Sequence, residues 1–151
     1  METNLDKVRA YYASFDEWGR LDAPEGAREL TRALEILTDK LAPGARVLDL
    51  GGGPGRYAIE LARRGHRVVL ADLSPELLEV ARRRVAETDL AGIESFDAVH
   101  AADLGRYADG SFDAVIAFGI PRLSGLMRPV HRENSPHSIA RSAAPPLICS
   151  S

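Results

Sequence analysis

The 151-residue chain has the size of a single domain, and its 45% hydrophobic and 27% charged residues are typical of a soluble globular protein. Its net charge of −3 gives no reason to expect nucleic acid or a membrane surface as a partner. The single cysteine, Cys149, and the lack of an apolar run long enough to span a bilayer favour a cytoplasmic protein.

Residues 120–151 differ in composition from the rest of the chain. They contain four arginines, one acidic residue and five of the nine prolines, so they carry +3 while residues 1–119 carry −6. No stretch in them keeps the period of a helix or a strand, and prolines recur too often for a helix. We expect this tail to be irregular or disordered.

Residues 1–44 are predicted to form a helical N-terminal cap. Apolar residues recur at helical spacing in the first 15 positions, which predicts a helix that runs toward Trp18. A second helix is expected to start at Asp22, because Glu25 three residues later resembles a capping box, and to end before Gly44.

From residue 45 onward, predicted strands and helices alternate. Ser74 is expected to be a helix N-cap, with Pro75 at the first helical position. This alternation implies β-α-β units with right-handed crossovers, so the fold class is α/β, a doubly wound, mostly parallel, Rossmann-like sheet. The strands are expected at 45–50, 67–72, 96–102 and 112–118, and the helices at 56–64 and from residue 75.

The segment 47–55, Val-Leu-Asp-Leu-Gly-Gly-Gly-Pro-Gly, is the most informative part of the sequence. An apolar strand passes through Asp49 and then meets Gly51, Gly53 and Gly55 before a helix begins. Such a turn lets a ligand contact bare backbone at a helix N-terminus. The pattern predicts a nucleotide-like cofactor.

Acidic residues stand at the ends of three predicted strands, where ligands bind in such sheets: Asp49, Asp72 and Asp103. At the tip of the second strand, Asp72 can accept both hydroxyl hydrogens of an adenosine ribose. The alternative is a helix-capping or solvated acid. Asp103 is placed to accept a hydrogen bond from an adenine amino group, unless it is simply an exposed acid.

The glycine turn also fits a dinucleotide fingerprint, because Gly53, Gly55 and Ala58 follow its spacing. Two features argue against a dinucleotide. Asp49, directly before the turn, would repel a pyrophosphate but suits a cofactor that carries an ammonium group. Asp103 suits an adenine amino group.

Together these motifs resemble those of class I S-adenosylmethionine-dependent methyltransferases. Residues 49–55 are similar to the first motif of that family, and Asp72 is similar to its ribose-binding acid. Residues 102–104, Ala-Asp-Leu, are similar to the adenine-side motif, and residues 111–115 to the motif of the fourth strand. The resemblance covers residues 1 to about 119.

The resemblance implies that S-adenosylmethionine is the cofactor and that the chain is an enzyme. The implied reaction transfers a methyl group to a small-molecule acceptor. The expected contacts are Asp49, Gly51, Gly53 and Gly55 for the methionine part, Asp72 and Leu73 for the ribose, and Asp103 and Leu104 for the adenine.

Aromatic residues near the N-terminus allow two interpretations. Tyr12 and Trp18 either pack between helices or belong to a helix that closes over the cofactor. No residue can be named as a catalytic base, and the histidines form no cluster with the spacing of a metal site.

The resemblance stops where the family continues with further strands and helices. We therefore interpret residues 1–119 as the cofactor-binding domain and hypothesise that residues 120–151 are a frameshifted or otherwise altered ending. The strand at 112–118 would then be a sheet edge through which the chain could associate with itself.

Three other functions stay open on the sequence alone. The chain could be an inactive fragment that only binds cofactor, a nicotinamide-dependent oxidoreductase, or an interaction module that pairs through its exposed strand.

Overall fold

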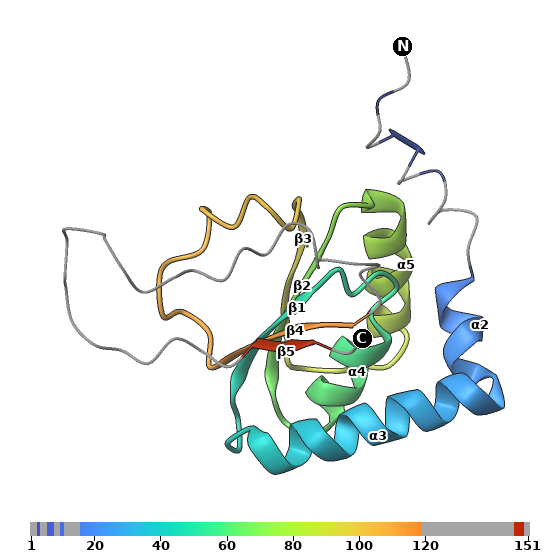
Figure 1. Cartoon of the computed structure of the whole chain (residues 1–151), viewed down its shortest axis with the longest axis vertical. Helices are drawn as coiled ribbons and strands as arrows, with labels where there is room; N and C mark the ends of the chain where they lie inside the picture. Colours follow the sequence, from blue (N-terminus) through green and yellow to red (C-terminus); the bar gives the residue numbers. More distant parts are fainter. Residues whose placement is uncertain (1–2, 4–5, 8–9, 11–15, 119–146, 150–151) are drawn as a thin grey trace.

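The computed structural model describes residues 3, 6–7, 10, 16–118 and 147–149. Helices and strands alternate along most of this part of the chain (Figure 1). In order, the elements are α2 (Glu17–Asp22), α3 (Pro24–Lys40), β1 (Arg46–Leu50), α4 (Arg56–Arg63), β2 (Arg67–Asp72), α5 (Pro75–Ala86), β3 (Ile93–Ala98), β4 (Ala114–Ala117) and β5 (Leu147–Cys149).

The strands form one sheet in the order β3-β2-β1-β4-β5, and each neighbouring pair is parallel. β1 lies in the middle, with β2 on one side and β4 on the other. The strand order reverses at β1, and ligands bind at such a switch point, outside the carboxyl ends of the strands. The predicted parallel α/β fold is confirmed.

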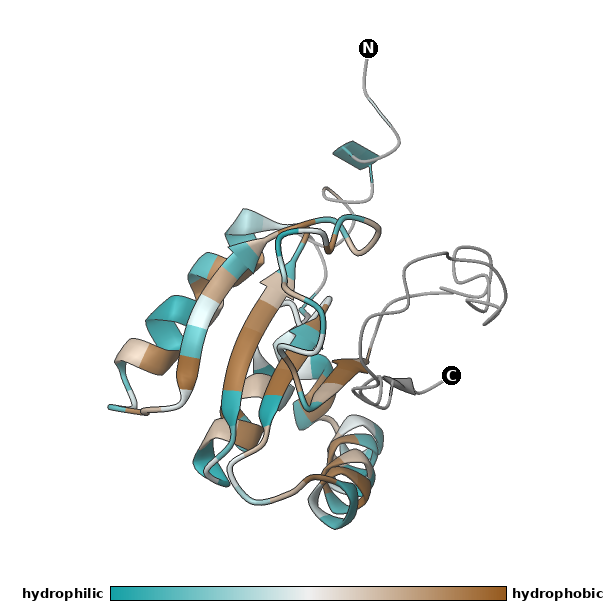
Figure 2. Ribbon diagram, turned by 90° about the vertical axis from the view of Figure 1, so that its left-hand side faces the viewer, coloured by the Kyte–Doolittle hydropathy of each residue, from teal (hydrophilic) through white to brown (hydrophobic). Residues whose placement is uncertain are grey.

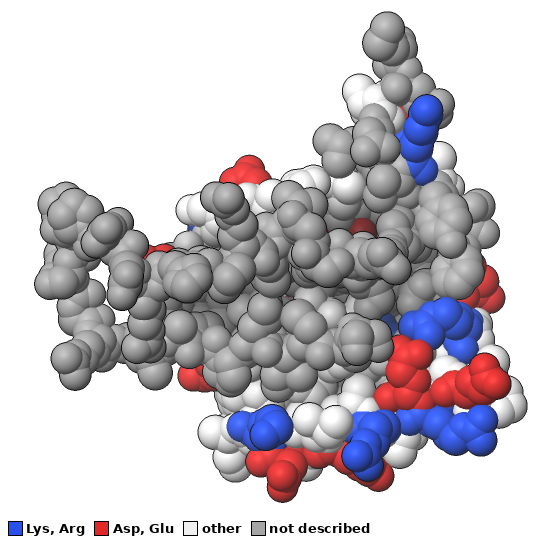
Figure 3. Space-filling view, in the orientation of Figure 1, with Lys and Arg blue, Asp and Glu red and all other residues white. Residues whose placement is uncertain are grey.

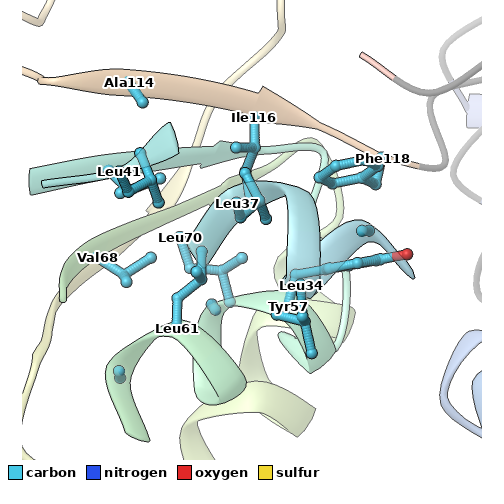
Figure 4. Packing of buried hydrophobic residues seen from close by; sticks show 14 of the residues in the cluster. Leu34, Leu37, Leu41, Tyr57, Leu61, Val68, Leu70, Ala114, Ile116 and Phe118 are labelled. Atoms are coloured by element: carbon cyan, nitrogen blue, oxygen red, sulfur yellow. The ribbon is translucent and has the colours of Figure 1, made fainter. Parts of the chain in front are cut away.

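Helices α3, α4 and α5 cover one face of the sheet (Figure 1). Leu37 of α3 and Leu61 of α4 belong to one buried cluster with Val68, Leu70 and Ile116 of the strands (Figure 4). All five side chains are at most 1% exposed. This cluster fixes the start of α4 relative to the carboxyl ends of β1 and β2.

The opposite face is covered by the connection between β3 and β4, residues 99–113. Leu104 and Tyr107 of this connection pack against a cluster that includes Leu50 and Val69. Within the residues that the structure describes, no helix lies on this face, although a doubly wound sheet is expected to carry helices on both. Short turns instead follow one another through the connection.

The two central strands are hydrophobic over most of their length (Figure 2). β1 and β2 each contain four consecutive buried positions. A strand with a neighbour on both sides and side chains packed on both faces has this near-continuous apolar run. The apolar runs in the sequence therefore located both strands correctly.

The third strand was predicted at 96–102 and lies at Ile93–Ala98. Its pairing with β2 already begins at Ile93, opposite Val68. It is an edge strand whose side chains are at most half-buried, so it has no apolar run to mark its bounds. Asp103 consequently lies in the loop beyond the strand rather than at its end.

The N-cap at Ser74 is confirmed, because its hydroxyl accepts a hydrogen bond from the Leu77 N–H at 3.3 Å. The capping box predicted at Asp22 is wrong. Ala23 is the N-cap of α3 and makes no side-chain cap bond, while Asp22 is the last residue of α2 and pairs with Arg56 at 2.8 Å. The chain starts a separate short helix here, so Asp22 serves the end of one helix instead of the start of the next.

The strand at 112–118 was predicted to be a sheet edge, and this is wrong. β5, from within the tail, pairs in parallel with β4 and places Leu147 opposite Val115 and Cys149 opposite Ala117. A three-residue apolar segment after two prolines is too short to show a period, so this strand could not be predicted from the hydrophobic pattern. The rest of the tail, residues 119–146 and 150–151, lies outside the described residues.

Most of the helix predicted before Trp18, including Tyr12, also lies outside the described residues. No helix among those that are described has the length and hydropathy needed to cross a membrane.

We expect Leu37→Ala to lower the free energy of unfolding by about 2–5 kcal/mol, because the change leaves a cavity where α3 packs on the sheet. Urea denaturation followed by circular dichroism measures this. Val80→Ala on α5, at a position 38% exposed, is the control and should change stability by less than about 0.5 kcal/mol. Equal effects of the two substitutions would contradict the packing of α3 described above.

Candidate functional site

The glycine turn connects the carboxyl end of β1 to the N-terminus of α4. Its backbone is tied to the neighbouring strand, because the Gly51 N–H donates to the Ala71 carbonyl oxygen at 2.7 Å. Gly55 is the N-cap of α4 and has a φ of 85°, a left-handed conformation that favours glycine. No side chain caps α4, because its N-cap residue is a glycine.

A side chain at the middle of the turn would not fit. A Cβ atom placed on Gly52 would collide with Leu70 and would lie 2.5 Å from Asp49 Oδ2. The turn therefore lies directly on β1 and β2, as expected of a backbone that a ligand approaches closely.

Asp72 is the last residue of β2, as predicted, and its carboxylate holds the glycine turn. Its Oδ2 accepts a hydrogen bond from the Gly53 N–H at 2.8 Å, and its Oδ1 accepts one from the Ser74 N–H at 2.8 Å. The side chain is half-buried, and each carboxylate oxygen can accept more than one hydrogen bond. Asp72 thus joins the turn to the start of α5.

Asp49 lies beneath the glycine turn and is fully buried. Neither of its carboxylate oxygens has a hydrogen-bond partner among the described residues. Burial, and next the negative charge of Asp72, raise the pKa of Asp49 from its ordinary value of 3.8 to about 7, while the backbone of Ala58 acts in the opposite direction. The site therefore holds a buried acid that binds its proton more tightly than an exposed carboxyl does.

Leu77 is a residue of the site that sequence reasoning missed. A Cβ placed on Gly53 would lie 3.6 Å from Leu77 Cδ1. Leu77 is in the first turn of α5, and its position directly after a strand that ends in Asp72 was the available signal. Leu73, between Asp72 and the N-cap of α5, is half-buried.

The predicted adenine-side residues lie on the connection between β3 and β4. Asp103 is exposed, and its N–H donates to the His100 carbonyl oxygen at 2.8 Å. Leu104 packs against the cluster on the second face of the sheet, which includes Leu50 and Ala71. The structure thus brings Leu104 under the carboxyl ends of β1 and β2, whereas Asp103 is not part of the group formed by Asp49, the glycines and Asp72.

Trp18 lies between helices. Arg56 of α4 and Arg84 of α5 place their guanidinium groups 4.6 and 3.7 Å from the centre of its ring. These contacts match the packing interpretation. Arg82 of α5 likewise lies over the Phe96 ring at 4.9 Å, so two of the three consecutive arginines 82–84 contact aromatic rings.

A separate groove of about 680 Å³ runs between α3 and α4. Leu21, Leu30, Leu34 and Arg56 are among the residues that line it, but no residue of the glycine turn does. Within the described residues no group of histidine, cysteine and acidic side chains could hold a metal ion. The glycine turn with its two acids is therefore the candidate site.

Residues 47–134 match the family model of a methyltransferase domain. The chain belongs to this methyltransferase family. The matched range contains the whole glycine turn, Asp72 and Leu104, and it extends past residue 119, where the resemblance was placed to end.

Two curated relatives and one solved structure illustrate the similarity. The magnesium-protoporphyrin O-methyltransferase of Rhodobacter capsulatus is 42% identical over 92 residues, which are 60% of this chain and 39% of that protein. The ubiquinone biosynthesis O-methyltransferase of Xanthomonas campestris is 36% identical over 117 residues, 76% of this chain and 47% of that protein. The chain thus spans about half the length, or less, of these curated relatives.

The solved structure is magnesium protoporphyrin IX methyltransferase from Synechocystis PCC 6803 with bound SAH. It matches with a TM-score of 0.61 and 25% identity, over 78% of this chain and 59% of that chain. The match confirms the Rossmann-like methyltransferase fold.

We expect Asp49→Asn to remove a pH dependence of stability. In the unfolded chain the carboxyl ionises near 3.8, and in the folded domain near 7, so the folded state holds its proton over this window. The stabilisation from Asp49 is complete below about pH 4 and is lost as the pH rises to about 7, a difference of about 4 kcal/mol. About 3 kcal/mol of this difference falls between pH 5 and pH 8, and urea denaturation at these two pH values measures it.

The asparagine variant should gain stability over the wild type between pH 5 and pH 8. Asp109→Asn, at an exposed turn, is the matched control and should show no such gain. A stability difference between Asp49→Asn and the wild type that stays constant with pH would show that Asp49 is not a buried, proton-binding acid.

Proposed function

We propose that this domain binds S-adenosylmethionine at the glycine turn and transfers its methyl group to a small-molecule acceptor. The observation that carries the proposal is the hydrogen bond from the Gly53 N–H to Asp72, which fixes a carboxylate beside bare backbone at the switch point of the sheet. The family membership supports the cofactor, and the names of the relatives support a small-molecule acceptor.

The ribose would bind to Asp72. Gly53 and Ser74 donate to different oxygens of the carboxylate, and each carboxylate oxygen can accept more than one hydrogen bond. Because two backbone N–H groups already orient the carboxylate, little conformational entropy is lost when a ribose binds. Leu77 and Leu73 would provide apolar contacts on the same side.

The methionine part of the cofactor would lie along the glycine turn. Its ammonium group would favour the ionised form of Asp49, the buried acid without a hydrogen-bond partner among the described residues. Asp49 lies behind Gly52, so we expect it to act across the turn rather than by direct contact. The backbone of Gly51, Gly53 and Gly55 would form the surface along which the methionine part lies.

The adenine would lie toward the connection between β3 and β4. Leu104 supplies apolar surface under the strand ends, and Asp103 would have to turn toward the crevice to accept from the adenine amino group. Of the two, Leu104 has the better support in the structure.

Bound there, S-adenosylmethionine supplies a methyl carbon whose bond to the sulfonium breaks with both electrons left on sulfur, as an acceptor lone pair forms the new bond. The residues of the domain would align the two reactants and exclude water. A base is needed only where the acceptor arrives protonated, and we assign none among the described residues.

We expect the wild-type domain to bind S-adenosylhomocysteine, and Asp72→Asn to bind it at least about tenfold more weakly. The substitution removes the charge that strengthens hydrogen bonds to the ribose hydroxyls, and its amide nitrogen cannot accept from one of the two backbone N–H groups that Asp72 now binds. Isothermal titration calorimetry gives both dissociation constants.

Asp109→Asn is the control for a lost surface carboxylate and should bind like the wild type. The same titration with NAD distinguishes the proposed function from the oxidoreductase alternative. The acids at the turn should prevent the pyrophosphate of NAD from binding. Equal affinity of wild type and Asp72→Asn, or binding of NAD alone, would refute the proposed site.

A further inference from the structure

The short helix α2 is joined to the first residue of α4. Trp18 lies against the Arg56 guanidinium at 4.6 Å, and Asp22, one turn later in α2, pairs with the same guanidinium at 2.8 Å. Arg56 directly follows Gly55, the last residue of the glycine turn. The helix is thus attached to the residue that leads out of the candidate site.

A second chain of contacts leads from α2 to the next residue of α4. Arg20 of α2 pairs with Glu29 of α3 at 2.8 Å, and the Tyr57 hydroxyl donates to the other carboxylate oxygen of Glu29 at 3.3 Å. Burial and the nearby Glu29 raise the pKa of Tyr57, so the hydroxyl keeps its proton and remains a donor. The Tyr57 ring stacks on Phe118, just beyond β4, with 4.6 Å between centroids (Figure 4).

These contacts differ from the usual exposed ion pair. The Arg56 side chain is only 21% exposed, and its Nε is buried without a hydrogen-bond partner. The Nε of Arg84, which lies over the same Trp18 ring, is buried in the same way. Two cations, each with a buried Nε, therefore share one indole ring, the aromatic group that attracts cations most strongly. Basic and acidic side chains alternate over this corner of the surface (Figure 3).

We propose that Trp18 and Arg56 are positioning residues that couple the docking of α2 to ligand binding at the glycine turn. The inference rests on the proposed function. α2 holds Arg56 and, through Glu29, Tyr57, so it fixes the first turn of α4, which directly follows the glycine turn. Trp18 acts on the cofactor through Arg56 and not by contact, which replaces the expectation that it closes over the cofactor.

Coupling of this kind is reciprocal, so it has two observable consequences. Loss of the α2 contacts should weaken ligand binding, and bound ligand should stabilise α2. The second effect can be followed at the backbone amides of Arg20 and Ala23, which donate to Asp16 and Gly19 within α2 at 3.0 and 3.2 Å.

The experiment measures the affinity of the whole chain for S-adenosylhomocysteine and the hydrogen exchange of α2 with and without this ligand. Trp18→Ala and Arg56→Met should each bind at least about fivefold more weakly than the wild type. Arg56→Lys keeps the charge beside Asp22 but loses the planar stacking, so its affinity should be intermediate. In the wild type, ligand should slow exchange at Arg20 and Ala23.

Arg63→Met is the matched control. Arg63 lies on the same helix and pairs with Glu60 at 2.6 Å, but the structure gives it no contact with α2. This variant should bind like the wild type, which separates positioning from a general loss of α4 stability.

Each outcome decides the question. Unchanged affinity of Trp18→Ala and Arg56→Met overturns the coupling, as does exchange of α2 that does not respond to ligand in the wild type. The exchange measurement needs no variant, so it still tests the coupling when Trp18→Ala fails to fold. Absence of binding by the wild type itself refutes the proposed function, and the coupling with it.

Discussion

The hydrogen bond between the Gly53 N–H and the Asp72 carboxylate is the interaction on which the site depends. It connects β1, β2 and the start of α5, because the same carboxylate also accepts from the Ser74 N–H. It adds to the backbone bonds from Gly51 and Gly52 to the Ala71 carbonyl oxygen in holding the turn, whose glycines have the largest conformational freedom in the unfolded chain. The ends of two parallel strands and the start of α5 therefore place one carboxylate where it serves both the fold and the proposed ribose contact.

The same arrangement buries Asp49, and burial of its ionised form lowers the stability of the folded domain. A fully buried carboxyl without a hydrogen-bond partner among the described residues does not stabilise the domain in its ionised form. Such a group is expected where function, and not stability, determines the residue type. A cationic ligand group above the turn would compensate its charge, so the proposed cofactor explains a feature that the fold alone does not.

The sequence predicted those parts of the molecule that depend on local pattern. The glycine turn, the strand that ends at Asp72 and the N-cap at Ser74 each follow from residues adjacent in the chain. The contacts of Trp18 with Arg84, the place of Leu77 beside Gly53 and the pairing of β5 with β4 join residues that are distant in sequence. The packing of the sheet and helices determines these contacts, and the hydrophobic periodicity of the sequence does not indicate them. Asp103 was misplaced for a related reason, because an edge strand carries a weak apolar pattern.

The central claim concerns where a ribose binds, and a crystal structure of the chain soaked with S-adenosylhomocysteine tests it most directly. The account predicts a ribose hydroxyl oxygen within about 2.5–3.0 Å of an Asp72 carboxylate oxygen, with the homocysteine part along residues 51–55. Ligand density elsewhere in the molecule, or a ribose held by other residues and not by Asp72, would contradict it.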